Sequence, residues 1–561
     1  MYPLTALLPA LSGSFLGSAN CSWVYSHRGA SRQRCHARIA RRSVVTLLLT
    51  HLVCGVTSLA AGVQGLIATG HDSRIDLKWT PAETREVAGY DVFRSVDGSG
   101  TFQKMNARPH VPHIYSDFIS SNDRTYFYRV VPVAGRAVPD AGDSPVVSAR
   151  TRKMSDDELL TSVQEATFRY FWDYGHPISG LACERNHAGD RVATGGTGFG
   201  LMVIMVGAER CFVTREQAAA RVLRMVTFLQ EKAERFHGAW THWLNGATGQ
   251  TIPFSVAKFD DGADLVETSF LMQGMLTVRQ YFDRHDPTEV EIRRRVTELW
   301  RGVEWDWFLQ SPGSRKLYWH WSPGHGWKKN LAIGGRFNEC MITYLLAIAS
   351  PTHAIPSECY YEGWAASAQY ASESTSFGIR QWVVRPMGGP LFFSHYSFLG
   401  FDPRNKRDRF CDYFENNRNI SLIHHAYAIA NPKGHKGYGP LVWGLTASDG
   451  PDRYAASAPD RDTGTVAPTA TLSAMPYTPE ASIAALKYYY HTLGLRLWGE
   501  FGFHDDFNLD RDWFARSYIA IDQGPIVCMI ENYRTGLCWR MFMANPEIAP
   551  MLKAIGWQTT R

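Results

Sequence analysis

Three acidic residues open a stretch of the chain that is otherwise almost free of charge. Asp260, Asp264 and Glu267 precede or enter the run 268–276, which contains no ionisable side chain. On a helix, their i, i+4 and i+7 spacing would place the three carboxylates on one face. Burying an unpaired carboxylate costs several kcal/mol, so these acids need partners or a cleft. The pattern also fits an ordinary helix start with a capping acid, and the segment favours both interpretations equally.

A further acid, Glu339, stands where another apolar segment begins. Asn338 and Glu339 lead from two glycines into the largely apolar residues 340–346. A carboxyl group beside an apolar helix loses hydration, which raises its pKa and suits a general acid at neutral pH. The helix dipole would equally favour a purely structural glutamate at this position.

Three loop segments combine aromatic rings with acids. They contain Trp443 and Asp449, then His504 and Asp506, and finally Asp522 followed by Glu531. Aromatic rings stack on sugar faces and carboxylates accept hydrogen bonds from hydroxyls, so the recurrence of this mixture indicates a saccharide site. Each segment alone is weak evidence, because Gly and Asp are also common in ordinary turns.

The elements that must position these residues fall into two modules. Over 64–152, apolar and polar residues alternate at 75–79, 90–94 and 126–133, which predicts a small β-sandwich. Its Trp79-Thr80-Pro81 and Gly89-Tyr90-Asp91-Val92-Phe93 motifs resemble a fibronectin type III module. Such modules act mostly as spacers or docking surfaces, so this one says little about chemistry.

From 153 to 561 the pattern becomes helical, which makes the chain mainly α. Capping boxes are predicted at Ser155 with Glu158, Thr214 with Gln217 and Thr288 with Glu291, and an N-cap at Thr478 before Pro479. The helices expected behind them cover 159–170, 218–229, 290–307 and 481–493. Long loops rich in Gly, Trp and Pro join them, which favours an α/α barrel over a bundle.

Composition excludes several classes of protein. The chain has 561 residues, a net charge of +5 and 13% aromatic residues, without basic blocks outside the first 42 residues, so no nucleic-acid partner is expected. Residues 1–61 contain arginines, a short apolar core and small residues, which predicts a secretory signal, a periplasmic or secreted protein and no stable membrane anchor. The residues before this pattern leave the true start of the protein open. Seven cysteines follow the leader without metal-type spacing, so we expect buried thiols with at most one disulfide.

The region from about Leu159 to Ile555 resembles the bacterial endo-β-1,2-glucanase family with a glycoamylase-like domain. The resemblance rests on six motifs: Gly195-Gly196-Thr197-Gly198-Phe199-Gly200, Gly262-Ala263-Asp264-Leu265-Val266-Glu267-Thr268, Phe337-Asn338-Glu339-Cys340-Met341, Trp443-Gly444-Leu445-Thr446-Ala447, Met475-Pro476-Tyr477-Thr478-Pro479 and Ile521-Asp522-Gln523-Gly524-Pro525. It implies an (α/α)6 barrel that cleaves β-1,2-glucan to sophorooligosaccharides with inversion. It also implies that Glu339 is the general acid and that Asp260, Asp264 and Glu267 serve activity or subsite binding.

An inverting glycosidase also needs a base that activates water on the opposite face of the sugar. We assign this role to Asp522, with Asp264 as the second choice and a relay as an open possibility. Sugar subsites are predicted at Trp443, Asp449, His504, Asp506 and Glu531, with Asp260 and Glu267. No cofactor or metal is expected, the partner is a β-glucan polysaccharide or oligosaccharide, and the chain is expected to be a monomer.

Other functions compete with this one. The spelling Asp260-Asp261-x-x-Asp264 matches the aspartate-rich pattern with which terpene cyclases chelate magnesium diphosphate, although the chain lacks their second metal motif. A non-catalytic polysaccharide-binding protein would fit the fibronectin-like module. Within glycosidases, exo action, glycosyl transfer and a glucoamylase-like activity on α-glucan remain alternatives, since the loops that close a cleft decide among them.

Overall fold

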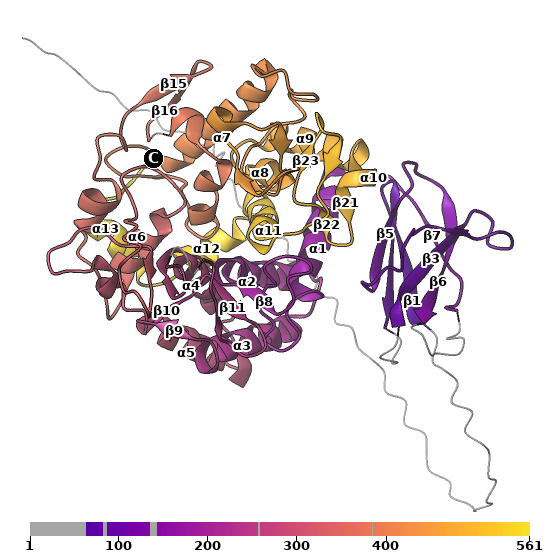
Figure 1. Ribbon diagram of the computed structural model, residues 1–561, viewed down its shortest axis with the longest axis horizontal. Helices are drawn as coiled ribbons and strands as arrows, with labels where there is room; N and C mark the ends of the chain where they lie inside the picture. Colours follow the sequence, from indigo (N-terminus) through magenta and orange to yellow (C-terminus); the bar gives the residue numbers. More distant parts are fainter. Residues whose placement is uncertain (1–62, 82–86, 135–142, 256–258, 384, 561) are drawn as a thin grey trace, which may run out of the picture. The chain divides into compact units, whose positions relative to one another are not determined.

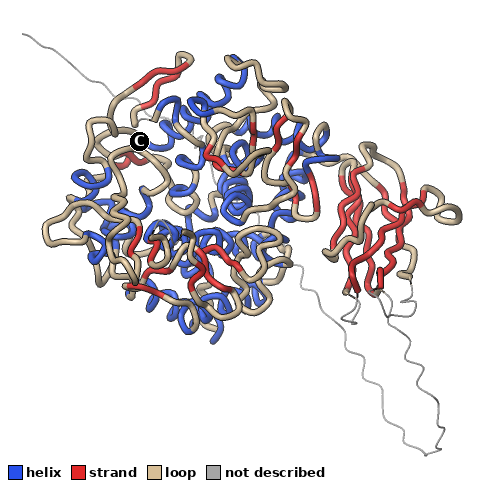
Figure 2. Tube along the Cα trace, in the orientation of Figure 1, coloured by secondary structure: helices blue, strands red, loops and turns tan. Residues whose placement is uncertain are grey.

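The computed structural model describes residues 63–81, 87–134, 143–255, 259–383 and 385–560 (Figure 1). The secretory signal predicted within 1–61 lies outside the described residues. Strands come first along the described chain, and from residue 156 onward helices joined by long loops dominate (Figure 2).

The strands between 64 and 150 form two antiparallel sheets, in the orders β1-β2-β5 and β4-β3-β6-β7. Their bounds are β1 Gln64–His71, β2 Arg74–Thr80, β3 Val87–Ser95, β4 Gln103–Lys104, β5 Ile114–Phe118, β6 Thr125–Ala134 and β7 Val147–Arg150. Ile75 and Leu77 from one sheet share a core with Val92, Tyr128 and Val130 from the other. The three strand patterns seen in the sequence therefore correspond to β2, β3 and β6. Burial alternates over 90–93 and 126–133, whereas β2 also buries Arg74 and Asp76 on either side of Ile75.

The helical region contains thirteen α-helices among the described residues. They are α1 Asp156–Trp172, α2 Thr194–Glu209, α3 Arg215–Glu231, α4 Leu265–Tyr281, α5 Pro287–Arg301, α6 Met341–Ala349, α7 Tyr413–Ala430, α8 Pro468–Ser473, α9 Pro479–His491, α10 Gly494–Leu497, α11 Ala520–Arg534, α12 Leu537–Met543 and α13 Ile548–Ala554. Helices that bury one face (α3, α5, α7 and α9) alternate along the chain with helices buried on nearly every side (α2, α4, α6, α8 and α11). The helices thus form an inner layer covered by an outer one, and successive helices along the chain belong to the two layers in turn.

Two inner helices approach each other through glycine. A Cβ atom on Gly198 of α2 would lie 2.2 Å from the carbonyl oxygen of Phe270 in α4, and one on Gly274 would lie 1.9 Å from the carbonyl oxygen of Gly198. Neither position has room for a side chain, so the backbones of α2 and α4 are in direct contact. Figure 1 shows α2 beside α4 and beside α11.

The predicted helix starts met different outcomes. Ser155 and Thr214 form the capping boxes expected of them. The box at Thr288 is wrong, because Asp286 caps α5 and Pro287 occupies its first turn. Thr478 stands at the N-cap of α9 before Pro479, but its hydroxyl donates to the Ala474 carbonyl instead of accepting from the helix.

All seven cysteines in the described part of the chain are free thiols, and six of them are buried. None of the described helices is both long enough and apolar enough to span a bilayer.

Candidate active site

A cavity of about 430 Å³ lies among the inner helices and the loops, most of which lead into these helices. Two of the predicted acids, Glu267 and Glu339, line it directly. The rest of the lining comprises Glu184, Arg185, Ala193, His242, Trp243, Phe254, Val266, Phe270, Trp319, Phe392, Tyr396, Ala447, Tyr454, Ile519 and Ile521. The cavity is therefore mainly apolar and aromatic, with a few converging charged groups, as is usual for a small-molecule site.

Glu267 is fixed by the glycine-rich start of α2. Its Oε2 atom accepts a hydrogen bond of 2.7 Å from the backbone N–H of Gly195. A Cβ atom on Gly195 would lie 2.7 Å from that same oxygen, so only glycine admits the carboxylate here. Burial raises the pKa of Glu267 to about 7, and the nearby Asp264 carboxylate adds to the rise.

Asp264 does not lie on a helix face with Asp260 and Glu267, so the predicted i, i+4, i+7 arrangement is wrong. The helix begins only at Leu265, and the Asp264 carboxylate caps it by accepting from the N–H groups of Val266 and Glu267 at 3.1 and 3.0 Å. Asp264 itself belongs to the two-residue strand β13 (Ala263–Asp264), whose partner is β14 (His320–Trp321). Capping and strand pairing, not helical periodicity, bring these acids together.

His242 joins two of the acids. Its Nδ1 atom lies 3.1 Å from Asp264 Oδ2, and its Nε2 atom lies 4.0 Å from Glu267 Oε1. Burial opposes the charged imidazolium, but the Glu267 charge and the Asp264 hydrogen bond outweigh it and raise the pKa of His242 to about 9. A cationic imidazole is thus held at the floor of the cavity at neutral pH.

Asp260 is paired with a lysine and a histidine. Its carboxylate lies 2.7 Å from Lys329 Nζ and 3.2 Å from His320 Nδ1. Burial works against ionisation, yet these partners hold the pKa of Asp260 at about 2. One ligand atom each from Asp260, Asp264 and His320 lie within 4.8 Å of one another, the one grouping among the described residues with metal-ligand geometry. Lys329 and His242 already supply positive charge there, so these acids are balanced by the protein itself.

Glu339 stands directly before Cys340, the N-cap residue of α6, and hydrogen bonds hold its backbone in place. The Ser397 hydroxyl donates to the Glu339 carbonyl and accepts from Ile342 N–H, while Asn338 accepts from Cys340 N–H. The carboxyl oxygen Oε2 is shielded from solvent and has no hydrogen-bond partner among the described residues. Burial raises the pKa of Glu339 to about 7, against the opposing charge of Arg385.

Asp522 lies behind the cavity wall. It is 1% exposed, in the first turn of α11, and its Oδ1 accepts a hydrogen bond of 3.1 Å from the Tyr396 hydroxyl. Tyr396 lines the cavity, so its side chain connects Asp522 with the cavity lining. Burial, reinforced by the neighbouring Asp505 carboxyl, raises the pKa of Asp522 well above its usual range.

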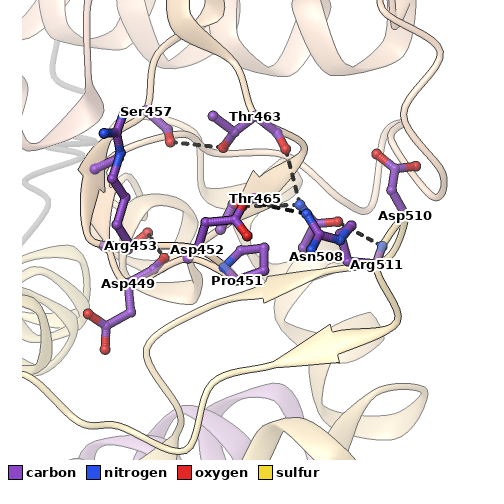
Figure 3. Close-up of a pocket in the computed structure, with 13 residues that line it drawn as sticks. Asp449, Pro451, Asp452, Arg453, Ser457, Thr463, Thr465, Asn508, Asp510 and Arg511 are labelled. Atoms are coloured by element: carbon purple, nitrogen blue, oxygen red, sulfur yellow. Dashed lines mark hydrogen bonds and ion pairs between the residues drawn. The ribbon is translucent and has the colours of Figure 1, made fainter.

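Asp449 lies at the border between this cavity and another. Both of its oxygens are 3.2 Å from a guanidinium nitrogen of Arg185, a residue that lines the Glu339 cavity. Asp449 itself lines a second, polar cavity (Figure 3).

Six predicted subsite residues do not line the Glu339 cavity: Asp260 and Asp449, described above, and Trp443, Glu531, His504 and Asp506. Trp443 is fully buried in the core, and Glu531 is fully buried in an ion pair of 2.7 Å with Arg210. Glu531 follows Asp522 by nine residues on α11, roughly 14 Å along the helix axis. His504 and Asp506 flank Asp505 in the chain and are at most 5% exposed. Burial lowers the pKa of His504 to about 4. Their contribution to sugar binding stays a prediction, and these contacts give it no support.

Several cavity residues escaped the sequence analysis. No motif spacing in the sequence connects the acids with four other residues of the lining, which only the fold brings close to them: Arg185, His242, Trp319 and Tyr396. The one available signal was their local company, since Trp240, Thr241 and Trp243 flank His242 in another aromatic and polar loop.

The chain is similar to proteins whose names describe activity on β-1,2-glucans. The family model Glycoamylase, described as "Putative glucoamylase", matches residues 334–546. An exo β-1,2-glucooligosaccharide sophorohydrolase (non-reducing end) from Parabacteroides distasonis is 44% identical over 511 residues, covering 87% of this chain and 70% of the relative. A β-1,2-glucanase structure from the same organism superposes with a TM-score of 0.83 at 43% identity, over 89% of this chain and 74% of the other. An endo-β-1,2-glucanase from Chitinophaga pinensis, solved with sophorotriose and glucose, gives 0.70 at 47% identity, over 72% and 99% of the two chains.

The Asp264 to His242 contact makes a direct prediction. Replacing Asp264→Asn keeps a side-chain oxygen for the helix cap but removes the negative charge, so the pKa of His242 should fall by about one unit or more. Nuclear magnetic resonance titration of histidine-labelled protein, with His242→Gln to assign the signal, measures this change. Asp261→Asn is the matched control and should leave the signal in place. An unchanged His242 pKa in the Asp264 variant would contradict the network described above.

Proposed function

We propose that this protein hydrolyses β-1,2-linked glucan with inversion. The premise is that the chain belongs to the glycoside hydrolase family of β-1,2-glucanases and sophorohydrolases with a glycoamylase-like domain. The observation that carries the proposal is Glu339, whose Oε2 atom is shielded from solvent and whose pKa is raised to about 7 at the edge of an aromatic-lined cavity. The alternation of inner and outer helices supports an (α/α)6 barrel around that cavity.

Glu339 acts as the general acid in this proposal. Because its carboxyl group retains a proton up to about pH 7, it can protonate the glycosidic oxygen as the bond to the anomeric carbon breaks. The Ser397 and Asn338 hydrogen bonds fix the backbone on either side, so the carboxyl group starts from a defined position. Glu267 and the imidazolium of His242 bind sugar hydroxyls beside it.

In its ionised form, which accepts the hydrogen bond of the Tyr396 hydroxyl, Asp522 acts as the base through Tyr396. The attacking water gives its proton to the Tyr396 oxygen while the Tyr396 proton passes to Asp522 Oδ1, and the water oxygen bonds the anomeric carbon opposite the leaving group. Asp264, the second choice from the sequence, is less suited because its oxygens are engaged by two backbone N–H groups and by His242. It is a positioning residue for His242 and for the start of α4.

The coverage of the relatives favours release of a disaccharide from the chain end. The Parabacteroides distasonis sequence and structure match 87% and 89% of this chain, whereas the Chitinophaga pinensis endo-enzyme matches 72%. The larger match extends beyond the helical region into the β-sandwich. We therefore propose exo action that releases sophorose, with endo action as the alternative.

Replacing Glu339→Gln should lower kcat on linear β-1,2-glucan by at least about 10³-fold, because the amide cannot donate a proton. In the unsubstituted protein, kcat/KM should fall as pH rises through about 7, where Glu339 loses its proton. Reducing-sugar release between pH 4 and 9 measures both. A Gln variant with normal turnover would remove Glu339 from the mechanism.

The relay makes its own prediction. Tyr396→Phe keeps the ring, which packs against Phe199, Phe270 and Phe392, but deletes the hydroxyl. We expect kcat to fall by about 100-fold or more while KM changes little, since general-base catalysis contributes about 10²–10⁴-fold. Tyr454→Phe, which alters another tyrosine of the same cavity, is the matched control. Equal kcat values for the two variants would exclude Tyr396 as the link to Asp522.

The products report both stereochemistry and mode of action. Inversion at a β-linkage must give the α-anomer at the newly formed reducing end, which proton nuclear magnetic resonance detects before mutarotation. Exo action should yield sophorose from the first turnovers of a long linear glucan. An initial β-anomer would contradict inversion, and an early ladder of longer oligosaccharides would show endo action instead.

A further inference from the structure

The polar cavity on the far side of Asp449 is separate from the cavity of Glu339. It measures about 460 Å³, within the range of small-molecule sites, and the two cavities share no lining residue. A short hairpin, β18 (Ala447–Ser448) with β19 (Ala455–Ala456), stands between them. Ala447 and Tyr454 face the Glu339 cavity, while the adjacent Ser448 and Ala455 face the polar one, because neighbouring strand residues point to opposite sides.

The floor of the polar cavity consists of neutral hydrogen-bonding groups. Ser457, Thr465 and Asn508 are each at most 3% exposed and line it (Figure 3). The Asn508 amide donates to the Thr463 carbonyl at 3.1 Å and to Thr465 Oγ1 at 3.2 Å, and accepts from the backbone N–H of Arg511 at 3.1 Å. The floor is thus pre-organised, and its hydroxyl oxygens keep lone pairs for a ligand.

The rim carries charges of both signs. Arg511 lies 3.4 Å from Asp452, and Asp510 is 2.6 Å from His435. Arg453 is exposed, and among the described residues its side chain has no hydrogen-bond or ion-pair partner. Three acids and two arginines in one lining favour neither a strongly anionic nor a strongly cationic ligand. They suit a neutral ligand whose hydroxyl groups both donate and accept.

We propose that this cavity is a second saccharide-binding site, which holds a glucose-containing segment of the β-1,2-glucan without cleaving it. This inference rests on the proposed function. Each acid of the lining is paired: Asp449 with Arg185, Asp452 with Arg511 and Asp510 with His435. The site therefore has no free proton donor for hydrolysis. It retains the polymer beside the Glu339 cavity and so raises the local concentration of cleavable ends.

Binding stoichiometry tests the site in the full chain. Isothermal titration of the Glu339→Gln variant with sophorose should show two sites, and adding Arg453→Ala or Thr465→Val should remove one. Arg418→Ala, which alters an exposed arginine outside both cavities, should keep two. One site in every variant would overturn the proposal, and thermal unfolding confirms that each variant is folded.

Kinetics supplies the second test, in a chain with Glu339 intact. Arg453→Ala should raise KM for long β-1,2-glucan about threefold to tenfold while kcat, and the kinetics on sophorotriose, stay unchanged. An unchanged KM for the polymer would overturn the second site and leave the proposed hydrolysis intact. Absence of any sugar release by the unsubstituted protein would instead refute the proposed function itself.

Discussion

The balance between desolvation and pairing of carboxyl groups governs this site. Burial raises the pKa of any carboxyl group, and each acid responds according to the partner that it finds. Asp260 meets Lys329 and His320 and remains ionised down to about pH 2. Glu339, whose Oε2 has no partner among the described residues, holds its proton to about pH 7. The site thus combines a fixed negative charge outside the cavity lining with an available proton in that lining, which suits acid-catalysed glycoside cleavage.

The fold creates this balance through close helix packing and a few short irregular segments. Contact between α2 and α4 at Gly198 and Gly274 leaves little room for water between them, and Gly195 turns a backbone N–H toward Glu267. The strand pair of Asp264 and His320 and the cap of α4 then set the remaining acids. The inner helices form a wall that excludes water, while the residues just before them carry the acidic side chains of the site.

The sequence predicted the participants better than their geometry. Local rules were enough for the sandwich strands, for the caps at Ser155 and Thr214, and for the expectation that acids before apolar helices converge. A shared helix face and a capped helix start were equally favoured interpretations of these acids. The structure has the cap, at Asp264, together with a strand pair to His320, 56 residues further along the chain. Helices α2 and α4 are buried on nearly all sides and show no amphipathic period to detect. Trp443 and Glu531 are of residue types common in sugar-binding sites but lie in the core. The sequence could not show this, because an aromatic or acidic residue at a cavity looks the same in a sequence as one that is fully buried.

The most direct test of this account is the pKa of the Glu339 carboxyl group itself. Carbon-13 nuclear magnetic resonance of protein labelled at glutamate side chains, with Glu339→Gln to assign the signal by difference, follows its titration without substrate. The account predicts a midpoint near pH 7. A midpoint near 4.5, the ordinary value for glutamate, would show that the carboxyl group is hydrated and ionised, and would contradict its role as the proton donor.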